Sequence, residues 1–250
     1  MLSIRKQAGD YRMAVSSKGG TVSEFHWGDK EIFYPQQIVS GKLRGGNPVC
    51  CPYFGKLDEF PDLPFHGWFR EEELNLEVQE NNGAYNITCP LVLLKRDDCF
   101  KYAYATLNHI LSVSGLFTSL SISEYFSLSP SPVNPGFHPY FPTLGEECQI
   151  VFGCETIVQI KKGEQGEFPA RLFPYPPHGI IHIHNTNGII TMRLSGDFSP
   201  DSSVIIWSDR VEEYICVEPV FGKIGEYAEL GKNGLSKKIE LCVAFVFAPR

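Results

Sequence analysis

Glycine and proline interrupt this chain at short intervals from one end to the other, and that spacing limits the folds that it can adopt. The 23 glycines and 18 prolines lie between short apolar runs and do not gather in a linker. No uninterrupted stretch longer than about 12 residues has apolar residues at the i, i+3, i+4 and i+7 positions of an amphipathic helix. The pattern instead favours many strands joined by tight turns.

Asparagine and glycine pairs mark the sharpest of these turns. Asn82-Gly83, Asn187-Gly188 and Asn233-Gly234 supply the positive φ angles that two-residue hairpin turns require. The middle pair lies between two runs rich in β-branched residues, 180–184 and 189–194, which favours two paired strands. Gly28-Asp29 separates TVSEFHW from KEIFY in the same way. Further strands are predicted at 85–94, 104–113, 203–207, 214–220 and 238–247.

These runs predict an all-β protein, a large antiparallel β-sandwich formed by a single domain over residues 1–250. Hydrophobic residues make up 43% of the chain and aromatic residues 13%, which is enough apolar material for one sizeable core. No shift in composition marks a domain boundary. No repeat of roughly 20 to 50 residues is visible either, which disfavours a propeller or a solenoid.

The charge balance argues against a nucleic-acid partner. The chain has 22 basic and 29 acidic residues, and its basic residues are not clustered. No apolar run approaches the roughly 18 to 20 residues of a membrane span, and the N-terminus has no apolar segment of signal-peptide length. We therefore expect a cytoplasmic protein with no membrane partner. Its 8 cysteines include no C-x-x-C pair, and most are expected to be free core residues.

Four segments contain the residues that are best suited to form a site. They cover residues 43–56, 65–71, 134–142 and 206–222. Each combines turn-forming or aromatic residues with a side chain that can bind a ligand or can transfer a proton. The candidate site residues are Arg44, His66, Trp68, Arg70, His138 and Glu218.

Glu218 and His138 have the chemistry of a proton-transfer pair. A carboxylate at the edge of an apolar strand is a candidate general base, because partial burial raises its proton affinity toward the working pH. His138, held among prolines and aromatic residues, is a candidate general acid near neutral pH. Each residue also has an ordinary interpretation: Glu218 as a solvated strand-end carboxylate, and His138 as a core imidazole bonded to a backbone carbonyl.

Two arginines and several aromatic residues are candidate ligand contacts. Arg44 and Arg70 can hold an anionic or polyhydroxy ligand through their fixed donors, or form ordinary surface ion pairs. Tyr53, Trp68 and Phe137 offer apolar faces for the C–H groups of a sugar, although aromatic residues more often form the core of an all-β protein.

Other kinds of site have weaker support. His182 and His184 share one face of a predicted strand and could bind a metal ion together with His178, but no Asp, Glu or Cys accompanies them, so no metal is expected. The loop at Gly45-Gly46 lacks the Lys-Ser/Thr of a nucleotide-binding loop. The sequence contains no G-x-S-x-G motif of a nucleophile-elbow hydrolase.

Taken in order, the four segments resemble the aldose 1-epimerase (galactose mutarotase-like) superfamily. The stretches LRGGNPVCCPYFG, FHGWFR and NPGFHPYF, and the W-S step before YICVEPV, look most like its bacterial aldose and hexose-6-phosphate mutarotase branch. The N-terminal SEFHWGDKEIFYP also fits the opening hairpin of that family. The resemblance implies a large β-sandwich with an open sugar cleft and no metal or organic cofactor.

The resemblance also implies a role for each site residue. Glu218 would be the general base on the anomeric hydroxyl, and His138 the general acid that protonates the ring oxygen. His66 would steady the same oxygen or the neighbouring hydroxyls, and Arg44 and Arg70 would contact the substrate. Ring opening, rotation of the free aldehyde and reclosure then invert C1. These roles imply that His138 is protonated and Glu218 ionised when each turnover starts, with a bell-shaped pH profile that belongs to the coupled site.

The sequence leaves some choices open. Asn47 stands where this branch usually has an apolar residue, and no motif selects among Asp197, Asp201 and Asp209 as the acid that holds sugar hydroxyls. We expect an aldose or aldose-phosphate 1-epimerase, a monomer or homodimer, whose small-molecule partner is a hexose or a hexose 6-phosphate. Clustered arginines favour the phosphate slightly. The alternatives are a non-catalytic carbohydrate-binding or sugar-sensing protein on the same fold, and a glycoside hydrolase, which needs a second carboxylate.

Overall fold

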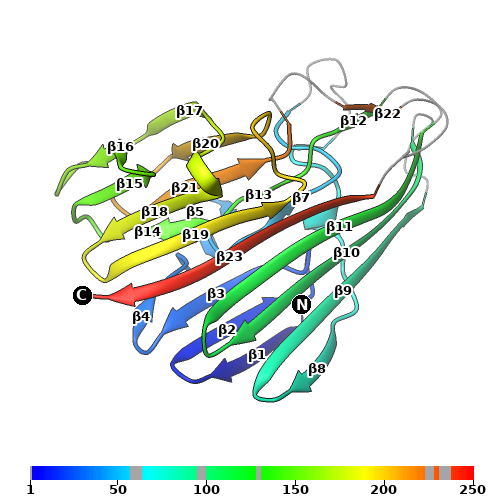
Figure 1. Ribbon diagram of the computed structural model, residues 1–250, viewed down its shortest axis with the longest axis horizontal. Coiled ribbons are helices and arrows are strands. Elements are labelled where there is room, and N and C mark those ends of the chain that lie inside the picture. The colour runs from blue at the N-terminus through cyan, green and yellow to red at the C-terminus, as the bar shows by residue number, and fades with distance from the viewer. Residues whose placement is uncertain (1, 57–63, 95–99, 128–130, 223–227, 231–237) are drawn as a thin grey trace.

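The fold is almost entirely β (Figure 1). The computed structural model describes residues 2–56, 64–94, 100–127, 131–222, 228–230 and 238–250. Within these ranges the only helical elements are two 3₁₀ turns, η1 (Phe69–Glu71) and η2 (Pro177–Gly179). The prediction of an all-β protein is confirmed. None of the helical elements in this part of the chain is long and apolar enough to cross a membrane.

The largest sheet has nine strands, each antiparallel to its neighbours. In spatial order they are β16 (Glu155–Ile160), β15 (Cys148–Phe152), β18 (Ile180–Asn185), β19 (Gly188–Gly196), β23 (Ile239–Pro249), β11 (Gly115–Ser127), β10 (Phe100–Ser112), β9 (Ala84–Leu94) and β8 (Glu77–Asn81). In Figure 1, β23 is the red strand between yellow β19 and green β11. Its alternate residues Leu241, Val243 and Phe245 are buried, as period-2 alternation requires of a sheet with one core face.

A six-stranded sheet positions two of the candidate site residues, Glu218 and His138. Its strands are β17 (Phe168–Pro174), β20 (Ser203–Ser208), β21 (Tyr214–Val220), β13 (Gly136–Phe137) and β7 (Val49–Cys50), with β14 (Tyr140–Pro142) also paired to β21. Every residue of β21 is buried, because this strand has neighbours on both edges and packing on both faces. A side chain on β21 is therefore held more firmly than one on an edge strand.

A four-stranded sheet and two short strand pairs complete the fold. The four strands are β1 (Ser3–Ala8), β2 (Tyr11–Ser16), β3 (Val22–Trp27) and β4 (Lys30–Glu31). The short pairs are β5 (Gln37–Val39) with β6 (Lys42–Arg44), and β12 (Ser131–Val133) with β22 (Ala228–Leu230).

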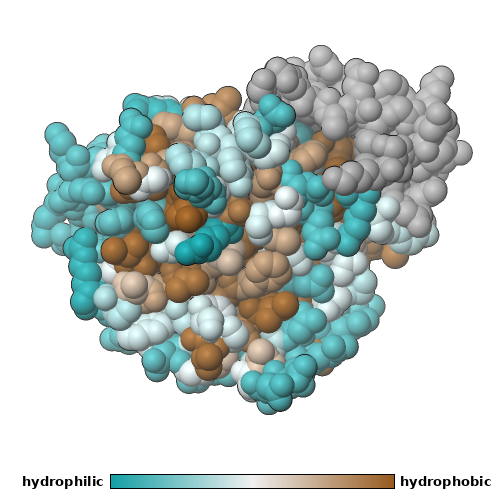
Figure 2. All heavy atoms as spheres, viewed as in Figure 1, coloured by the Kyte–Doolittle hydropathy of each residue, from teal (hydrophilic) through white to brown (hydrophobic). Residues whose placement is uncertain are grey.

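One core cluster joins the three large sheets. The Phe245 ring of β23 lies 6.3 Å from that of Phe141 in β14, and the Phe247 ring lies 5.7 Å from that of Trp27 in β3. These contacts give the layered packing of a β-sandwich. On the face shown in Figure 2, apolar side chains gather over the middle strands and polar ones surround them. The predicted large antiparallel β-sandwich is thus confirmed.

Two of the three hairpins predicted at Asn-Gly pairs lie in the described residues and are present, but the turn of one of them differs. Asn82-Gly83 joins β8 to β9 with φ angles of +50° and +76°, as expected. Between β18 and β19 the turn residues are Thr186 and Asn187, and Gly188 is already paired with Asn185. The Asn185 side chain sets this register, because its Oδ1 accepts hydrogen bonds from the amides of Asn187 and Gly188. The third pair, 233–234, lies outside the described residues.

The predicted strands at 85–94, 104–113, 203–207, 214–220 and 238–247 correspond to β9, β10, β20, β21 and β23. The run KEIFY forms a shorter strand than expected, since β4 ends at Glu31. The amides of Ile32 and Phe33 both donate to the carbonyl of Phe25, which turns the chain into the core.

Most of the cysteines are free core residues, as predicted. Among the described residues six free cysteines are buried, and Cys154 is exposed. Cys99 lies outside the described residues.

Candidate active site

A cavity of about 710 Å³ brings the four candidate segments together. That volume is within the range of roughly 300 to 1,000 Å³ found for small-molecule sites. Five of the six predicted site residues line it: Arg44, His66, Arg70, His138 and Glu218. These residues are up to 174 positions apart in the sequence (218 − 44), so only the fold brings them together.

Glu218 is placed by the alternation of β21. Tyr214, Cys216 and Glu218 share one face of the strand, whereas Ile215 and Val217 enter the main core from the other face. Glu218 lines the cavity and yet is only 3% exposed. It is therefore not the solvated strand-end carboxylate of the ordinary interpretation.

His138 lies between β13 and β14 and meets Glu218 across the sheet. Its backbone amide donates to the Pro48 carbonyl at 3.0 Å, and its ring is nearly parallel to that of Tyr140, with centroids 4.9 Å apart. Its Nε2 is 3.4 Å from Oε1 of Glu218. Its Nδ1 is buried and has no hydrogen-bond partner among the described residues.

Burial places the single proton of this pair on Glu218. Desolvation raises the pKa of the Glu218 carboxyl well above 4.5, and the nearby Arg70 guanidinium opposes this only in part. Desolvation also lowers the pKa of His138 to about 3, with Arg70 and Arg44 acting in the same direction. The sequence-based expectation of a protonated His138 beside an ionised Glu218 is therefore not the favoured resting state. Both arrangements contain the same number of protons and differ only in which residue holds one.

His66 presents a fixed hydrogen-bond donor to the cavity. Its Nδ1 accepts from the Gly55 amide at 3.0 Å, so the neutral ring has its proton on Nε2. Burial lowers the pKa of His66, and the neighbouring His138 lowers it further, which keeps the ring neutral. Its φ of +67° and that of Gly67, +75°, turn the chain sharply at this point.

Gly67→Ala is expected to destabilise the protein by about 3 kcal/mol, since a positive φ strains alanine and the crowded site must also shift. A Cβ at Gly67 would lie 2.2 Å from the Cys51 carbonyl oxygen. Gly83→Ala is the matched control, because Gly83 has a φ of +76° and open space at its Cβ position. It should cost about 1 to 2 kcal/mol in urea unfolding. Equal losses in the two variants would show that the contact with Cys51 is unimportant.

Arg44 is held rigidly at the cavity wall. Its Nε and Nη2 donate to Oδ2 of Asp209 at 3.1 and 2.7 Å, and its guanidinium lies 5.3 Å from the Trp207 ring centroid. The Tyr214 hydroxyl donates to the other oxygen of Asp209. Arg70 lines the same cavity, with its Nε 3.9 Å from Oε1 of Glu71.

None of the three aspartates that the sequence left open is among the residues that line the cavity. Asp209 is occupied by Arg44 and Tyr214. Asp197 accepts the Glu240 amide at the edge between β19 and β23, and Asp201 is exposed in a turn. Of the described residues, the acidic one that lines the cavity besides Glu218 is Glu71, whose side chain is 57% exposed.

The aromatic wall differs from the predicted one. Trp68 does not line the cavity; it is buried and packs edge-to-face on Tyr53, with ring centroids 5.8 Å apart. Phe137 and Tyr53 are also core residues. The aromatic lining comes from other positions: Phe54, Phe65, Tyr140 and Trp207. Trp207 could have been found from the W-S step before YICVEPV, since it lies on β20 beside β21.

The three histidines of the conceivable metal site do not form one. His182 and His184 share a face of β18 with ring centroids 6.2 Å apart, and His182 Nδ1 lies 3.1 Å from the Thr191 hydroxyl. Within the described ranges, neither of them nor His178 belongs to a cluster of three potential metal ligands.

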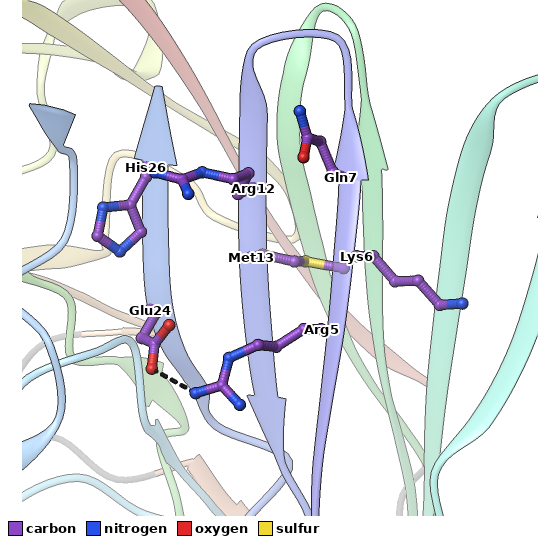
Figure 3. Close-up of a pocket in the computed structure, with 7 residues that line it drawn as sticks. All are labelled: Arg5, Lys6, Gln7, Arg12, Met13, Glu24 and His26. Atoms are coloured by element: carbon purple, nitrogen blue, oxygen red, sulfur yellow. Dashed lines mark hydrogen bonds and ion pairs between the residues drawn. The ribbon is translucent and has the colours of Figure 1, made fainter. Parts of the chain in front are cut away.

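A second cavity, of about 450 Å³, lies on the four-stranded sheet (Figure 3). Its Arg5 and Glu24 form an ion pair at 2.9 Å that is largely exposed. Lys6 points away from this pair in Figure 3 and lies 4.9 Å from the Tyr85 ring centroid. In the part of the chain that the structure describes, the residues that line it include no buried acid-base pair, in contrast to the first cavity.

Comparison with solved structures identifies the fold. The Slr1438 protein from Synechocystis sp. PCC 6803 aligns with a TM-score of 0.75 and 18% identity over 100% of this chain and 96% of that one. A galactose mutarotase related enzyme from Lactobacillus acidophilus has a TM-score of 0.70 and 16% identity, over 99% and 97%. A galactose mutarotase-like protein from Lactobacillus casei ATCC 334 has a TM-score of 0.71 and 15% identity, over 99% and 100%.

No protein-family model matches the chain, and no curated protein matches it either. The fold is galactose mutarotase-like over essentially the whole chain, as the resemblance of the four segments implies.

Proposed function

We propose that this protein is an aldose 1-epimerase that interconverts the α and β anomers of a hexose or a hexose 6-phosphate. The observation that carries the proposal is the buried pair of His138 and Glu218, 3.4 Å apart in a cavity large enough for a hexose. The galactose mutarotase-like fold supports the same function.

The pair needs only one proton to open the sugar ring. Transfer of that proton from Glu218 to His138 gives a carboxylate and an imidazolium, the combination that ring opening requires. His138 then donates to the ring oxygen O5 while Glu218 accepts the proton of O1. The C1–O5 bond breaks, C1=O1 forms, and the pair returns to the neutral state that burial favours.

Reclosure reverses these transfers after the aldehyde has turned its other face toward O5. Glu218 returns a proton to O1 as His138 removes one from the attacking hydroxyl, and C1 closes with inverted configuration. The Nε2–H of His66 is suited to hold O5 or a neighbouring hydroxyl throughout, because its orientation is fixed by the bond from Gly55.

The charges of the cavity favour a phosphorylated substrate within this class. Among the described residues that line it, Lys42, Lys56 and Arg70 accompany Arg44, and the one exposed carboxylate is Glu71. Glu218 contributes no negative charge while it holds the proton of the pair. A phosphate dianion benefits from several nearby cations more than a neutral hydroxyl does.

Magnetisation-exchange NMR between the α and β anomeric protons of glucose, galactose and glucose 6-phosphate tests the proposal. Faster exchange for one of these sugars on addition of the protein is the expected result. If a sugar binds in a titration and its exchange is not accelerated, the epimerase proposal fails for that sugar, and a carbohydrate-binding protein becomes the better description.

Arg70→Gln is expected to move both limbs of the bell-shaped pH profile of kcat/KM to higher pH. Arg70 lowers the pKa of both Glu218 and His138, so its removal raises both. On the acidic limb, the pair therefore takes up a second proton at a higher pH than in the wild type. On the basic limb, it loses its single proton at a higher pH as well. The profile is measured by the same NMR exchange across pH.

Lys42→Gln is the matched control for Arg70→Gln, since it removes a cation of the same cavity that does not act on either pKa. Both limbs should then stay in place. A shift of the Arg70→Gln profile toward lower pH would contradict the assigned pair.

A further inference from the structure

Cys216 stands beside the acid-base pair and has no part in the proposed reaction. It lies two residues before Glu218 on β21, so both side chains lie on the same face of the strand. Its thiol is fully buried and accepts a hydrogen bond from the Tyr140 hydroxyl. A single buried cysteine is ordinary in a core, but this one has two further metal-ligating side chains next to it.

The donor atoms of His138, Cys216 and Glu218 all lie within 4.8 Å of one another, and all three residues are buried. Among the residues that the structure describes, no other group of three His, Cys, Asp or Glu side chains has this spacing. We propose that these three side chains form a binding site for a thiophilic divalent cation, Zn²⁺ above all, and that the bound ion blocks the proton-transfer pair.

The donor set favours Zn²⁺ over harder cations. Thiolate and imidazole are ligands for Zn²⁺, whereas Mg²⁺ and Ca²⁺ prefer oxygen alone. Zinc bonds of roughly 2.0 to 2.3 Å place tetrahedral donors about 3.3 to 3.7 Å apart. His138 Nε2 and Glu218 Oε1 already meet this condition at 3.4 Å, and closure around an ion needs Cys216 to approach by at most about 1.5 Å.

The charge balance of binding is also satisfied. The thiol of Cys216 and the neutral pair each release one proton to solvent, which leaves a thiolate, a carboxylate and a neutral imidazole. Two negative ligands offset the two positive charges of the ion, so it adds no net charge beside Arg44 and Arg70. Binding should therefore strengthen as pH rises.

An ion at this position would abolish the proposed reaction. It occupies Nε2 of His138 and an oxygen of Glu218, the two atoms between which the proton must move. Because His138 and Glu218 line the cavity, a water molecule or a sugar hydroxyl could reach the ion from there as a fourth ligand.

Cobalt substitution tests the site without any assay of activity. Co²⁺ bound by a thiolate gives an intense near-ultraviolet charge-transfer band, and competition with Zn²⁺ then measures the affinity for zinc. We expect one equivalent of Co²⁺ to produce the band in the wild type and in Cys154→Ser, in which the exposed cysteine is removed. The band should be absent in Cys216→Ser, and the apparent affinity for Zn²⁺ at least tenfold lower.

Glu218→Gln provides a second variant in case Cys216→Ser does not fold, as judged by circular dichroism. It keeps the thiolate and therefore the band, but at least tenfold more Co²⁺ should be needed to reach half its intensity. A band that persists in Cys216→Ser or disappears in Cys154→Ser would overturn the proposal, as would a wild type that shows no band. Unchanged affinity in Glu218→Gln would overturn the three-residue site.

The inhibitory effect rests on the proposed epimerase function and is measured separately. Zn²⁺ should stop anomer exchange in the wild type, and a chelator should restore it. If no sugar exchanges at all, the proposed function fails while the cobalt band still reports on the metal site. If exchange continues when the cobalt-defined site is saturated with zinc, the inhibitory part of the proposal is wrong.

Discussion

Glu218→Gln is expected to reduce the acceleration of anomer exchange by about 10³-fold, within the range of general acid-base catalysis. Glutamine keeps the shape of the side chain but cannot accept the O1 proton. Because the carboxyl is buried and holds a proton at rest, its replacement by an uncharged amide should change the free energy of unfolding by only about 1 kcal/mol. The exchange is followed by NMR with glucose 6-phosphate, glucose and galactose.

Glu71→Gln makes the same chemical change in the same cavity and serves as the control. Glu71 is largely exposed and is not part of the proton-transfer pair, so exchange should fall less than about threefold, far below the range of acid-base catalysis. Comparable losses in the two variants would mean that Glu218 acts only through the general charge of the cavity.

His138→Gln is expected to reduce exchange by about 10² to 10³-fold, because among the described lining residues His138 is the one that shares a proton with Glu218 and can donate it to O5. His66 cannot replace it, since its Nδ1 accepts the Gly55 amide and burial beside His138 lowers its pKa. The variant should still bind the sugar, which a titration followed by NMR line broadening measures.

The double variant His138→Gln, Glu218→Gln tests whether the two residues act as one coupled pair or as two independent catalytic groups. If the two side chains pass a single proton, the double variant should lose about as much activity as the more damaged single variant. Multiplication of the two single losses, to about 10⁵-fold or more, would contradict a coupled pair.

Much of the candidate site could be predicted from the sequence, because its residues lie where local pattern constrains them. The apolar run YICVEPV fixes a strand, and period-2 alternation then places Glu218 and Cys216 on one face. The prolines around His138 fix the backbone that carries the imidazole. The ordered motifs indicated the galactose mutarotase-like fold, although no single motif was specific.

Other features depend on contacts between distant parts of the chain and could not be predicted. Trp68 was expected at the sugar because it lies between His66 and Arg70, yet its ring packs on Tyr53 in the core. The hydrogen bond between Asp209 and Arg44 could not be predicted either, because the two residues are 165 positions apart in the sequence. The proton of the pair was expected on His138; its position depends on burial, which only the complete fold determines.

The pairing of Glu218 with His138 also determines whether the pocket must exchange protons with solvent during turnover. The proton that leaves O1 and the proton that reaches O5 both belong to a pair that ends each half-reaction in its starting state. A turnover therefore takes up no proton from solvent and releases none to it. A site of this kind works without a water chain or a conduit to the surface, so full burial of its two reactive groups does not slow it. The rate of anomer exchange should therefore be independent of buffer concentration, because the isomerisation neither consumes nor releases a proton.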